Sequence, residues 1–262
     1  MPLYTDQLSR KIELSARPRR IISVVPSQTE LLYELGLDDE VIGITKFCVH
    51  PKEWFKTKIR IGGTKQLNLQ KIKELQPDLI VANKEENRKE EIEKLEKEFP
   101  VWISDVHDLS SAYVMIDNLG KIVNREKESQ ELINKIEFKF HNLSLNQTKI
   151  RTAYLIWKDP YLTVGKDTFI HQMLLHAGFE NVFSDKTRYP RIEINDLVER
   201  DCDLLLLSSE PYPFKQIHIG ELQPLVPNTK ILLADGELFS WYGSRMLKAP
   251  SYFQKLHAIA IQ

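Results

Sequence analysis

A cysteine and a histidine stand two residues apart in the stretch TKFCVHPKEWF, residues 45–55. Residues two apart in an extended segment point to the same side, so the side chains of Cys48 and His50 can face one ligand. A thiolate beside an imidazole can bind a transition metal, or act as a nucleophile with its general base. The same side chains can also line a binding surface, and the local sequence leaves all three interpretations open.

The rest of the chain supports the third interpretation best. A zinc site needs three or four ligands, and no second closely spaced pair of ligand residues is present. A cysteine nucleophile needs groups that activate the thiol and orient the base, and no such motif surrounds Cys48. The other cysteine, Cys202, precedes the apolar run DLLLLSS and is expected in the core. We therefore expect Cys48 and His50 to line a binding surface, where they are candidate ligands for a metal in the bound molecule.

Other polar residues follow expected strands in the first part of the chain. The stretch SQTE, residues 27–30, is also a capping box, in which the Ser27 hydroxyl and the Glu30 carboxylate bind the first amides of a helix. A helix start at a binding surface also favours an anionic group. The further ligand-binding candidates of this part are Ser27, Lys46, Phe47, Lys84, Glu85 and His107.

Aromatic residues gather after expected strands in the second part of the chain. They lie in the stretches IWKDPYLTVGK, SSEPYPF and GELFSWYGSR. Broad ring faces suit a flat, partly apolar ligand, and a guanidinium such as that of Arg245 can bind its carboxylates. The VGKDT stretch is not a phosphate-binding loop, because the first glycine and the Ser/Thr after the lysine are missing. The candidates here are Trp157, Tyr161, Glu210, Trp241, Tyr242 and Arg245.

These residues need elements that bring them together. Short apolar runs alternate with amphipathic helical stretches, which indicates an α/β fold with parallel sheets. The expected strands are residues 21–25, 41–45, 78–82, 101–105, 151–157, 203–208 and 230–234. Ligands of such sheets collect beyond the carboxyl ends of the strands.

The region between the two sets of strands is helical. Residues 111–143 contain no proline and have apolar residues at helical spacing, so they predict a long helix with one break near Asn124. We expect two Rossmann-like lobes, residues 1–110 and 146–262, joined by a single long spine helix within residues 111–145, with the ligand in the cleft between the lobes.

The two parts of the chain also resemble each other. Residues 68–83 can be aligned with residues 193–208, which matches Glu74 with Glu199. Residues 30–43 similarly match residues 172–183, each with a glycine that closes a helix before a strand. The similarity favours two lobes of like construction.

Charge and hydropathy exclude several classes of protein. The 262 residues include 36 basic and 37 acidic residues, so no excess charge favours nucleic acid or an anionic membrane. No apolar run reaches the roughly 18 residues that span a bilayer, and the first 20 residues contain no signal-peptide core. The sequence as given predicts a cytoplasmic monomer, or an extracytoplasmic protein if a signal peptide was removed.

Several stretches, taken together, resemble one known family. Residues 17–45 (RPRRIISVVPSQTELLYELGLDDEVIGIT), residues 62–82 (GGTKQLNLQKIKELQPDLIVA) and residues 161–183 (YLTVGKDTFIHQMLLHAGFENVF), with the helical region, are similar to the bilobal substrate-binding proteins of ABC importers for cobalamin and iron chelates. These are also called helical-backbone metal receptors. The resemblance implies a non-enzymatic receptor for a corrinoid, haem or iron siderophore, with no covalently bound cofactor, or a cytoplasmic carrier or sensor derived from such a receptor.

Two alternatives remain beside this receptor. One is an enzyme that uses Cys48 and His50, or a metal, in the same cleft. The other is a receptor for a bare transition metal, with His50, His107 and Glu85 as ligands.

The resemblance also implies docking to a membrane permease through one glutamate on each lobe. Gln70 and Asn195 occupy those positions here. A neutral amide loses the charge-assisted part of a contact with a permease arginine, so we expect weakened docking. Comparison of permease binding by the unaltered protein and by Gln70→Glu and Asn195→Glu variants tests this, and tight arginine-dependent docking of the unaltered protein would refute it.

Overall fold

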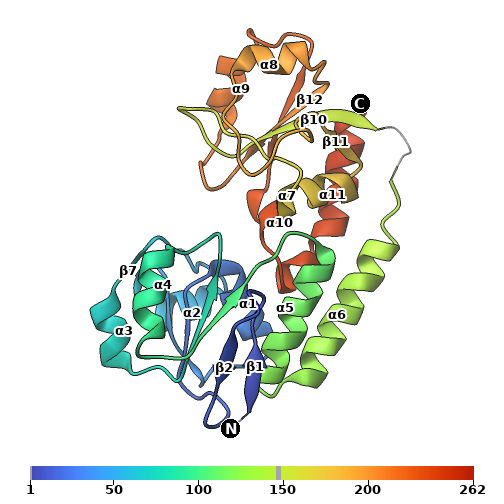
Figure 1. Ribbon diagram of the computed structural model, residues 1–262. Coiled ribbons are helices and arrows are strands. Elements are labelled where there is room, and N and C mark those ends of the chain that lie inside the picture. Colours follow the sequence, from blue (N-terminus) through green and yellow to red (C-terminus); the bar gives the residue numbers. More distant parts are fainter. Residues whose placement is uncertain (1, 146–148) are drawn as a thin grey trace. The chain divides into compact units, whose positions relative to one another are not determined.

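The computed structural model describes residues 2–145 and 149–262, and these form two compact units (Figure 1). Unit 1 comprises Met1–Val106, Ser110–Lys135 and Tyr242–Arg245. Unit 2 comprises His107–Leu109, Ile136–Trp241 and Met246–Gln262. The chain therefore passes between the units several times, and a short segment near its C-terminal end belongs to unit 1.

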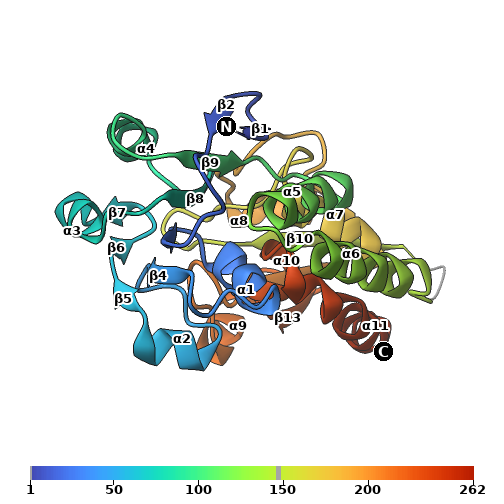
Figure 2. The same ribbon diagram turned by 90° about the horizontal axis from the view of Figure 1, so that it is seen from below.

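Unit 1 contains a parallel five-stranded sheet with the order β5-β4-β3-β8-β9 (Figure 2). Its strands are β3 (Ile21–Ser23), β4 (Val41–Ile44), β5 (Ile59–Arg60), β8 (Leu79–Asn83) and β9 (Val101–Ser104). All residues of β3, β8 and β9 are buried, as expected for parallel strands covered on both faces. The four strands predicted in this part are confirmed, whereas β5 is too short to be seen in the sequence pattern.

The helices of unit 1 are α1 (Pro26–Glu34), α2 (Lys52–Thr57), α3 (Leu69–Leu75) and α4 (Lys89–Glu96). Helix α1 begins with Pro26 in its first turn, and its N-cap residue Val25 makes no side-chain capping bond. The predicted capping box of Ser27 and Glu30 is therefore wrong. A proline fits the first turn because the amide it lacks would have no partner within the helix.

The helical region that follows consists of two helices, α5 (Leu109–Ile122) and α6 (Glu126–His141), rather than one continuous helix. The expected break near Asn124 is confirmed, and this residue has a φ of 57°, a left-handed conformation that asparagine tolerates. Gly120 lets the two helices meet closely, because a Cβ atom there would lie 2.1 Å from Ser129 Oγ.

Two small hairpins complete unit 1. They are β1 (Leu3–Thr5) with β2 (Lys11–Glu13), and β6 (Gly62–Gly63) with β7 (Gln66–Leu67). The turn between β1 and β2 covers the outer edge of β9: Gln7 N donates to Ile103 O (3.2 Å), and Arg10 Nη2 donates to Val101 O (3.2 Å). A covered edge is protected from pairing with another chain.

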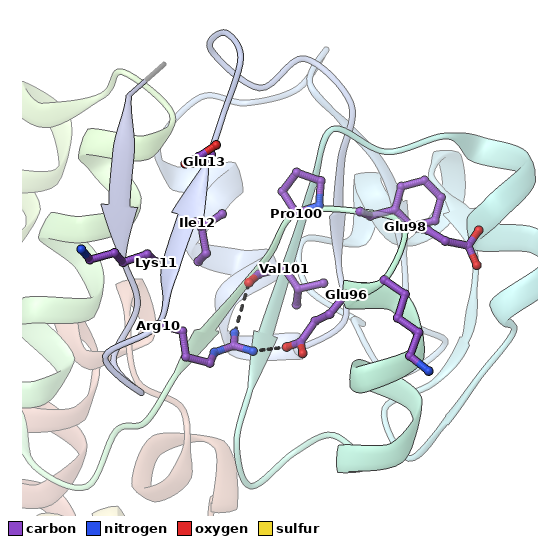
Figure 3. A pocket seen from close by; sticks show the side chains of 10 residues that line it. Arg10, Lys11, Ile12, Glu13, Glu96, Glu98, Pro100 and Val101 are labelled. Atoms are coloured by element: carbon purple, nitrogen blue, oxygen red, sulfur yellow. Dashed lines mark hydrogen bonds and ion pairs between the residues drawn. The ribbon is translucent and has the colours of Figure 1, made fainter.

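A groove of about 530 Å³ lies beside this hairpin. Figure 3 shows Arg10, one of the residues that line the groove, bound to both the Glu96 carboxylate and the Val101 carbonyl. The groove opens at Pro100 and Val101, where β9 begins, so it lies at the end of the sheet opposite to the carboxyl ends of the strands. It is therefore separate from the expected ligand site.

Unit 2 contains a parallel four-stranded sheet with the order β11-β10-β12-β13. The strands are β10 (Ile150–Leu155), β11 (Phe179–Asn181), β12 (Leu204–Ser208) and β13 (Lys230–Ala234). The three strands predicted here are confirmed, and β11 is additional. Tyr154 and Leu205–Leu207 form much of the core, all of them inaccessible to solvent.

The helices of unit 2 are α7 (Phe169–His176), α8 (Ile194–Glu199), α9 (Gln216–Leu222), α10 (Gly236–Ser240) and α11 (Ala249–Ala260). A short 3-10 helix, η1 (Ser244–Leu247), lies between α10 and α11 in the chain, and its first two residues belong to unit 1. The internal similarity has a structural basis, because α1 leads to β4 and α7 leads to β11 through left-handed glycines, Gly36 and Gly178. Among the described residues, none of the helices has the length and apolar character to span a membrane.

Candidate functional site

Cys48 follows β4, but its side chain points into the interior of unit 1. The residue has no exposed surface, and its Sγ atom lies 3.0 Å from Thr29 Oγ1 and 3.1 Å from Thr45 Oγ1. Burial raises the pKa of the Cys48 thiol, and the hydrogen bonds with the two threonines only partly oppose this effect. The prediction that Cys48 lines a binding surface or ligates a metal is therefore corrected, because a buried neutral thiol is unavailable to a ligand.

The burial of Cys48 predicts slow reaction with a thiol reagent. At pH 8 we expect modification of the folded protein by 5,5′-dithiobis(2-nitrobenzoate) to be at least about a hundredfold slower than in urea, because thiolate forms only after local opening. Cys202 should be equally protected, since burial raises the pKa of its thiol to about 11. A Ser15→Cys variant, at an exposed position, provides the reactive control. Rapid modification of Cys48 in the native protein would contradict its assigned burial.

The neighbours of Cys48 in the same loop do reach the surface. Phe47 is 51% exposed, and Lys46 Nζ lies 5.0 Å from the centre of its ring. His50 is half-buried and precedes a cis peptide bond to Pro51. The loop thus turns the thiol inward while it presents a ring, an ammonium group and an imidazole at the carboxyl end of β4.

The carboxyl ends of β8 and β9 carry a buried polar network. The Ser104 hydroxyl accepts hydrogen bonds from Asn83 Nδ2 (2.9 Å) and from Gln28 Nε2, and Asn87 Nδ2 donates to Val24 O (3.2 Å). Buried polar groups that hydrogen-bond to one another fix the loops that they join. This network could not be predicted from the sequence, because its members are distant in the chain.

The exposed Lys84 and the half-buried Glu85 lie next to this network. Lys84 Nζ forms an ion pair with Asp105 (2.6 Å), and the Glu85 amide donates to Asn83 Oδ1 (2.8 Å). His107 is placed in unit 2, with a 60% exposed side chain whose Nε2 lies 3.7 Å from Asp108.

Arg245 binds a residue of unit 1 and not an open surface. Its Nε and Nη2 atoms donate to the two carboxylate oxygens of Glu30, at 2.7 and 2.8 Å. The side chains are only 8% and 13% exposed. Such a two-point ion pair satisfies the guanidinium, so the prediction that Arg245 binds a carboxylate of the ligand is corrected.

Tyr242, in the same segment, is 6% exposed. Burial raises the pKa of the Tyr242 phenol well above its usual value, and the negative charge of Glu86 adds to this shift. Ser27 is 5% exposed. The 242–245 segment is therefore part of the packing of unit 1 around α1.

The carboxyl end of the unit 2 sheet contains a second polar group. The Glu210 carboxylate accepts hydrogen bonds from Ser240 Oγ (2.6 Å) and Trp241 Nε1 (2.8 Å). This hydrogen bond from Trp241 holds its indole at the end of α10, where the residue is 7% exposed. The roles of Glu210, Trp241 and Tyr242 in ligand binding stay predictions.

An aromatic cluster lies on the surface beyond β10 and β12. Trp157 is 40% exposed, and its ring centre lies 5.8 Å from that of Tyr212 at an angle of 69°. Tyr212 in turn contacts Phe214 and His218, with ring centres 4.7 and 5.5 Å away. These four residues, with the half-buried Tyr161, form the Trp157 cluster. His218 was not predicted from the sequence, because it belongs to α9 and no expected strand ends directly before it.

Charged side chains border the Trp157 cluster. Lys158 Nζ forms an ion pair with Glu221 (2.5 Å). The hydrogen bond to Glu221 raises the pKa of Lys158, and the same bond lowers the pKa of the Glu221 carboxyl. The Trp157 cluster is therefore a surface of aromatic rings with the Lys158–Glu221 ion pair at its margin.

The two amides expected at the docking positions have similar environments. Gln70 Nε2 donates to Glu74 Oε1 (3.1 Å) on α3, and Asn195 Nδ2 donates to Glu199 Oε1 (2.6 Å) on α8. Each amide is exposed and is held by the carboxylate one turn further on. The expected weakening of permease docking stays a prediction.

No group of three or more Cys, His, Asp or Glu side chains in residues 2–145 and 149–262 is arranged to hold a metal ion. The alternative of a receptor for a bare transition metal, with His50, His107 and Glu85 as ligands, therefore has no ligand set to support it.

Known proteins resemble this chain along most of its length. The family of periplasmic binding proteins matches residues 21–222. An uncharacterised ABC transporter substrate-binding lipoprotein, YvrC of Bacillus subtilis, is 26% identical over 217 residues, which are 78% of this chain and 68% of that protein. A vitamin B12-binding protein of Vibrio vulnificus is 28% identical over 207 residues, 75% of this chain and 74% of the relative.

A solved structure has the same fold. The periplasmic heme-binding protein RhuT of Roseiflexus sp. RS-1, in its apo form, superimposes with a TM-score of 0.79 and is 18% identical. The superposition covers 93% of this chain and 99% of that protein.

Proposed function

Because this chain belongs to the periplasmic binding protein family, we propose that it binds a small molecule and delivers it to an ABC importer. Members of this family bind ligands for transport, and the relative from Bacillus subtilis is described as a component of such a transporter. A non-enzymatic role is consistent with the burial of Cys48, because the thiol of the competing Cys/His enzyme is inaccessible.

The proposed ligand is a metal-bearing chelate, which is a corrinoid, a haem or an iron siderophore. The sequence relatives include vitamin B12-binding proteins. The observation that carries this proposal is the exposed face of Trp157 within the Trp157 cluster, at the carboxyl end of the unit 2 sheet. A flat apolar ligand gains both area burial and ring stacking on such a surface.

Unit 1 carries polar groups of its own that suit the same class of ligand. These are the exposed Lys46 and Lys84, with Glu85 beside Lys84, and the two ammonium groups suit carboxylates or phosphates at the edge of a chelate. Phe47 adds a second exposed ring at the carboxyl end of β4. His50, and not Cys48, is the proposed donor to the metal of the ligand, since only its imidazole reaches the surface of that loop.

Replacement of Trp157 tests the ligand and its site together. Titration with cyanocobalamin, hemin and a ferric siderophore, followed by absorbance, should show saturable binding of one of them. Trp157→Ala should weaken this binding about tenfold, since ring stacking and lost apolar area are worth roughly 1–2 kcal/mol. Phe138→Ala, which removes a 69% exposed ring elsewhere, should leave the affinity unchanged. Absence of saturable binding for all three ligands would refute the proposal.

The proposed protein partner follows from the family, whereas the cellular compartment in which the protein acts is a matter for experiment. We propose that an ABC permease receives the ligand from this protein. Glu74 and Glu199, which lie next to the altered docking positions, are the proposed carboxylates for contact with the permease. The relatives are periplasmic proteins or a lipoprotein, so action outside the cytoplasm is the proposal that fits them, and the cytoplasmic location expected from the sequence stays a prediction.

A further inference from the structure

Helix α2 and strand β5 carry basic and apolar side chains together on the surface of unit 1. Residues 52–60 include four basic residues and one acidic residue, although the whole chain has 36 basic and 37 acidic residues. Phe55 and Ile59 are 41% and 39% exposed. The basic and exposed apolar members of this segment, which we name the α2–β5 patch, are Lys52, Phe55, Lys56, Lys58, Ile59 and Arg60, and the exposed Glu53 and Thr57 lie among them.

The cations of the patch are held beside its aromatic rings. The Arg60 guanidinium carbon lies 4.4 Å from the centre of the Phe55 ring, and Lys58 Nζ lies 5.1 Å from that of Trp54. Trp54 is 1% exposed and packs edge-on against Tyr33 at 5.3 Å. The buried indole therefore anchors α2, and the exposed Phe55 ring projects from a rigid base with a cation against it.

The charge of the patch is not neutralised by ion pairs. Within the part of the chain that the structure describes, no carboxylate forms a salt bridge with any of its four basic side chains. Asp38 is an acidic neighbour, but its carboxylate accepts the Trp54 indole N–H, and Lys58 binds its backbone carbonyl. Glu53 is the acidic residue within the segment.

The patch lies on one outer edge of the unit 1 sheet. Strand β5 is the terminal strand in the order β5-β4-β3-β8-β9, and α2 lies beside it (Figure 2). The opposite edge, at β9, is covered by the turn of the β1–β2 hairpin. The edge at β5 is thus the one that combines exposed apolar side chains with positive charge.

We propose that the α2–β5 patch docks the protein on an anionic lipid surface. Apolar side chains ringed by lysine and arginine enter the headgroup region, while the cations bind the lipid anions. Single-stranded nucleic acid fits less well, because it needs a series of aromatic platforms and the patch exposes one ring and one aliphatic side chain. The proposal is independent of the ligand, since none of the six residues belongs to the candidate ligand site.

Vesicle binding of the full chain tests the proposal. We expect co-sedimentation with phosphatidylcholine vesicles that contain about 30% phosphatidylserine, weak binding to pure phosphatidylcholine, and loss of binding as NaCl rises from about 0.05 to about 0.5 M. Lys52→Glu/Lys56→Glu should reduce the partition coefficient at least about tenfold. The control Lys127→Glu/Lys135→Glu makes the same change in net charge on exposed positions of α6 and should have little effect.

A second matched pair of variants tests the contribution of apolar side chains to vesicle binding. Phe55→Ser should weaken binding about fivefold, whereas Phe138→Ser, at the 69% exposed ring of α6, should not. Circular dichroism and urea unfolding establish that each variant is folded. The proposal is overturned if the unaltered protein does not bind phosphatidylserine vesicles at low salt, if both charge variants lose binding equally, or if a single-stranded oligonucleotide binds the patch more tightly than the vesicles.

Discussion

Replacement of Glu30 by alanine is expected to lower the free energy of unfolding by about 3–5 kcal/mol, because the mutation removes the carboxylate that binds Arg245 at two points. Both side chains are at least 87% buried, so water replaces the lost partner poorly. The ion pair joins residues 215 positions apart in the chain. We therefore expect this contact to hold the 242–245 segment in unit 1.

A double-mutant cycle isolates the contribution of this pair. Urea unfolding of Glu30→Ala, Arg245→Ala and the double variant should show a double variant that is less destabilised than the sum of the single ones. Glu34→Ala, at an exposed position on the same helix, controls for loss of a glutamate from α1 and should cost less than about 0.5 kcal/mol. Additive effects, or a near-neutral Glu30→Ala, would show that the pair is not formed as described.

The second large effect is expected at Gly120, where α5 and α6 pack most closely. A Cβ atom at this position would lie 2.1 Å from Ser129 Oγ and 2.5 Å from Ser129 Cβ, so Gly120→Ala must separate the helices. We expect a loss of about 2–3 kcal/mol, which exceeds the gain of roughly 1 kcal/mol from the better helix propensity of alanine. Thermal and urea unfolding measure this difference.

The clash can be relieved from the opposite helix. Ser129→Gly removes both atoms that meet the new methyl group, so the Gly120→Ala/Ser129→Gly protein should regain at least half of the lost stability. Gly220→Ala in α9 is the matched control, because a Cβ atom there meets nothing within 4 Å, and it should be neutral or slightly stabilising. A stable Gly120→Ala protein would mean that the two helices are further apart than described.

Local sequence patterns identified most of the elements that position the site. The seven predicted strands are present because buried parallel strands appear as short, continuous apolar runs. The strands β5 and β11 were missed, since two or three residues give too little pattern. Phe47 lies after β4 and Trp157 lies after β10, and both are exposed, while their role in ligand binding stays a prediction.

The orientation of individual side chains was harder to predict. The spacing of Cys48 and His50 suggested a shared direction, but a tight loop with two threonines turns the thiol inward. The Ser27 capping box failed because α1 begins at Pro26, two residues earlier than a Ser27 cap requires, and because Glu30 binds Arg245. In both cases a partner distant in sequence outweighed a local preference.

The sequence by itself determined the α/β class, the alternation of strands and helices, the helical break at Asn124 and the family, because these depend on apolar periodicity, turn residues and local similarity. Only the tertiary structure decided that Cys48 is buried, that Arg245 is bound to Glu30, and that the 242–245 segment belongs to unit 1. These features depend on contacts between residues far apart in the chain, and no local pattern encodes such contacts.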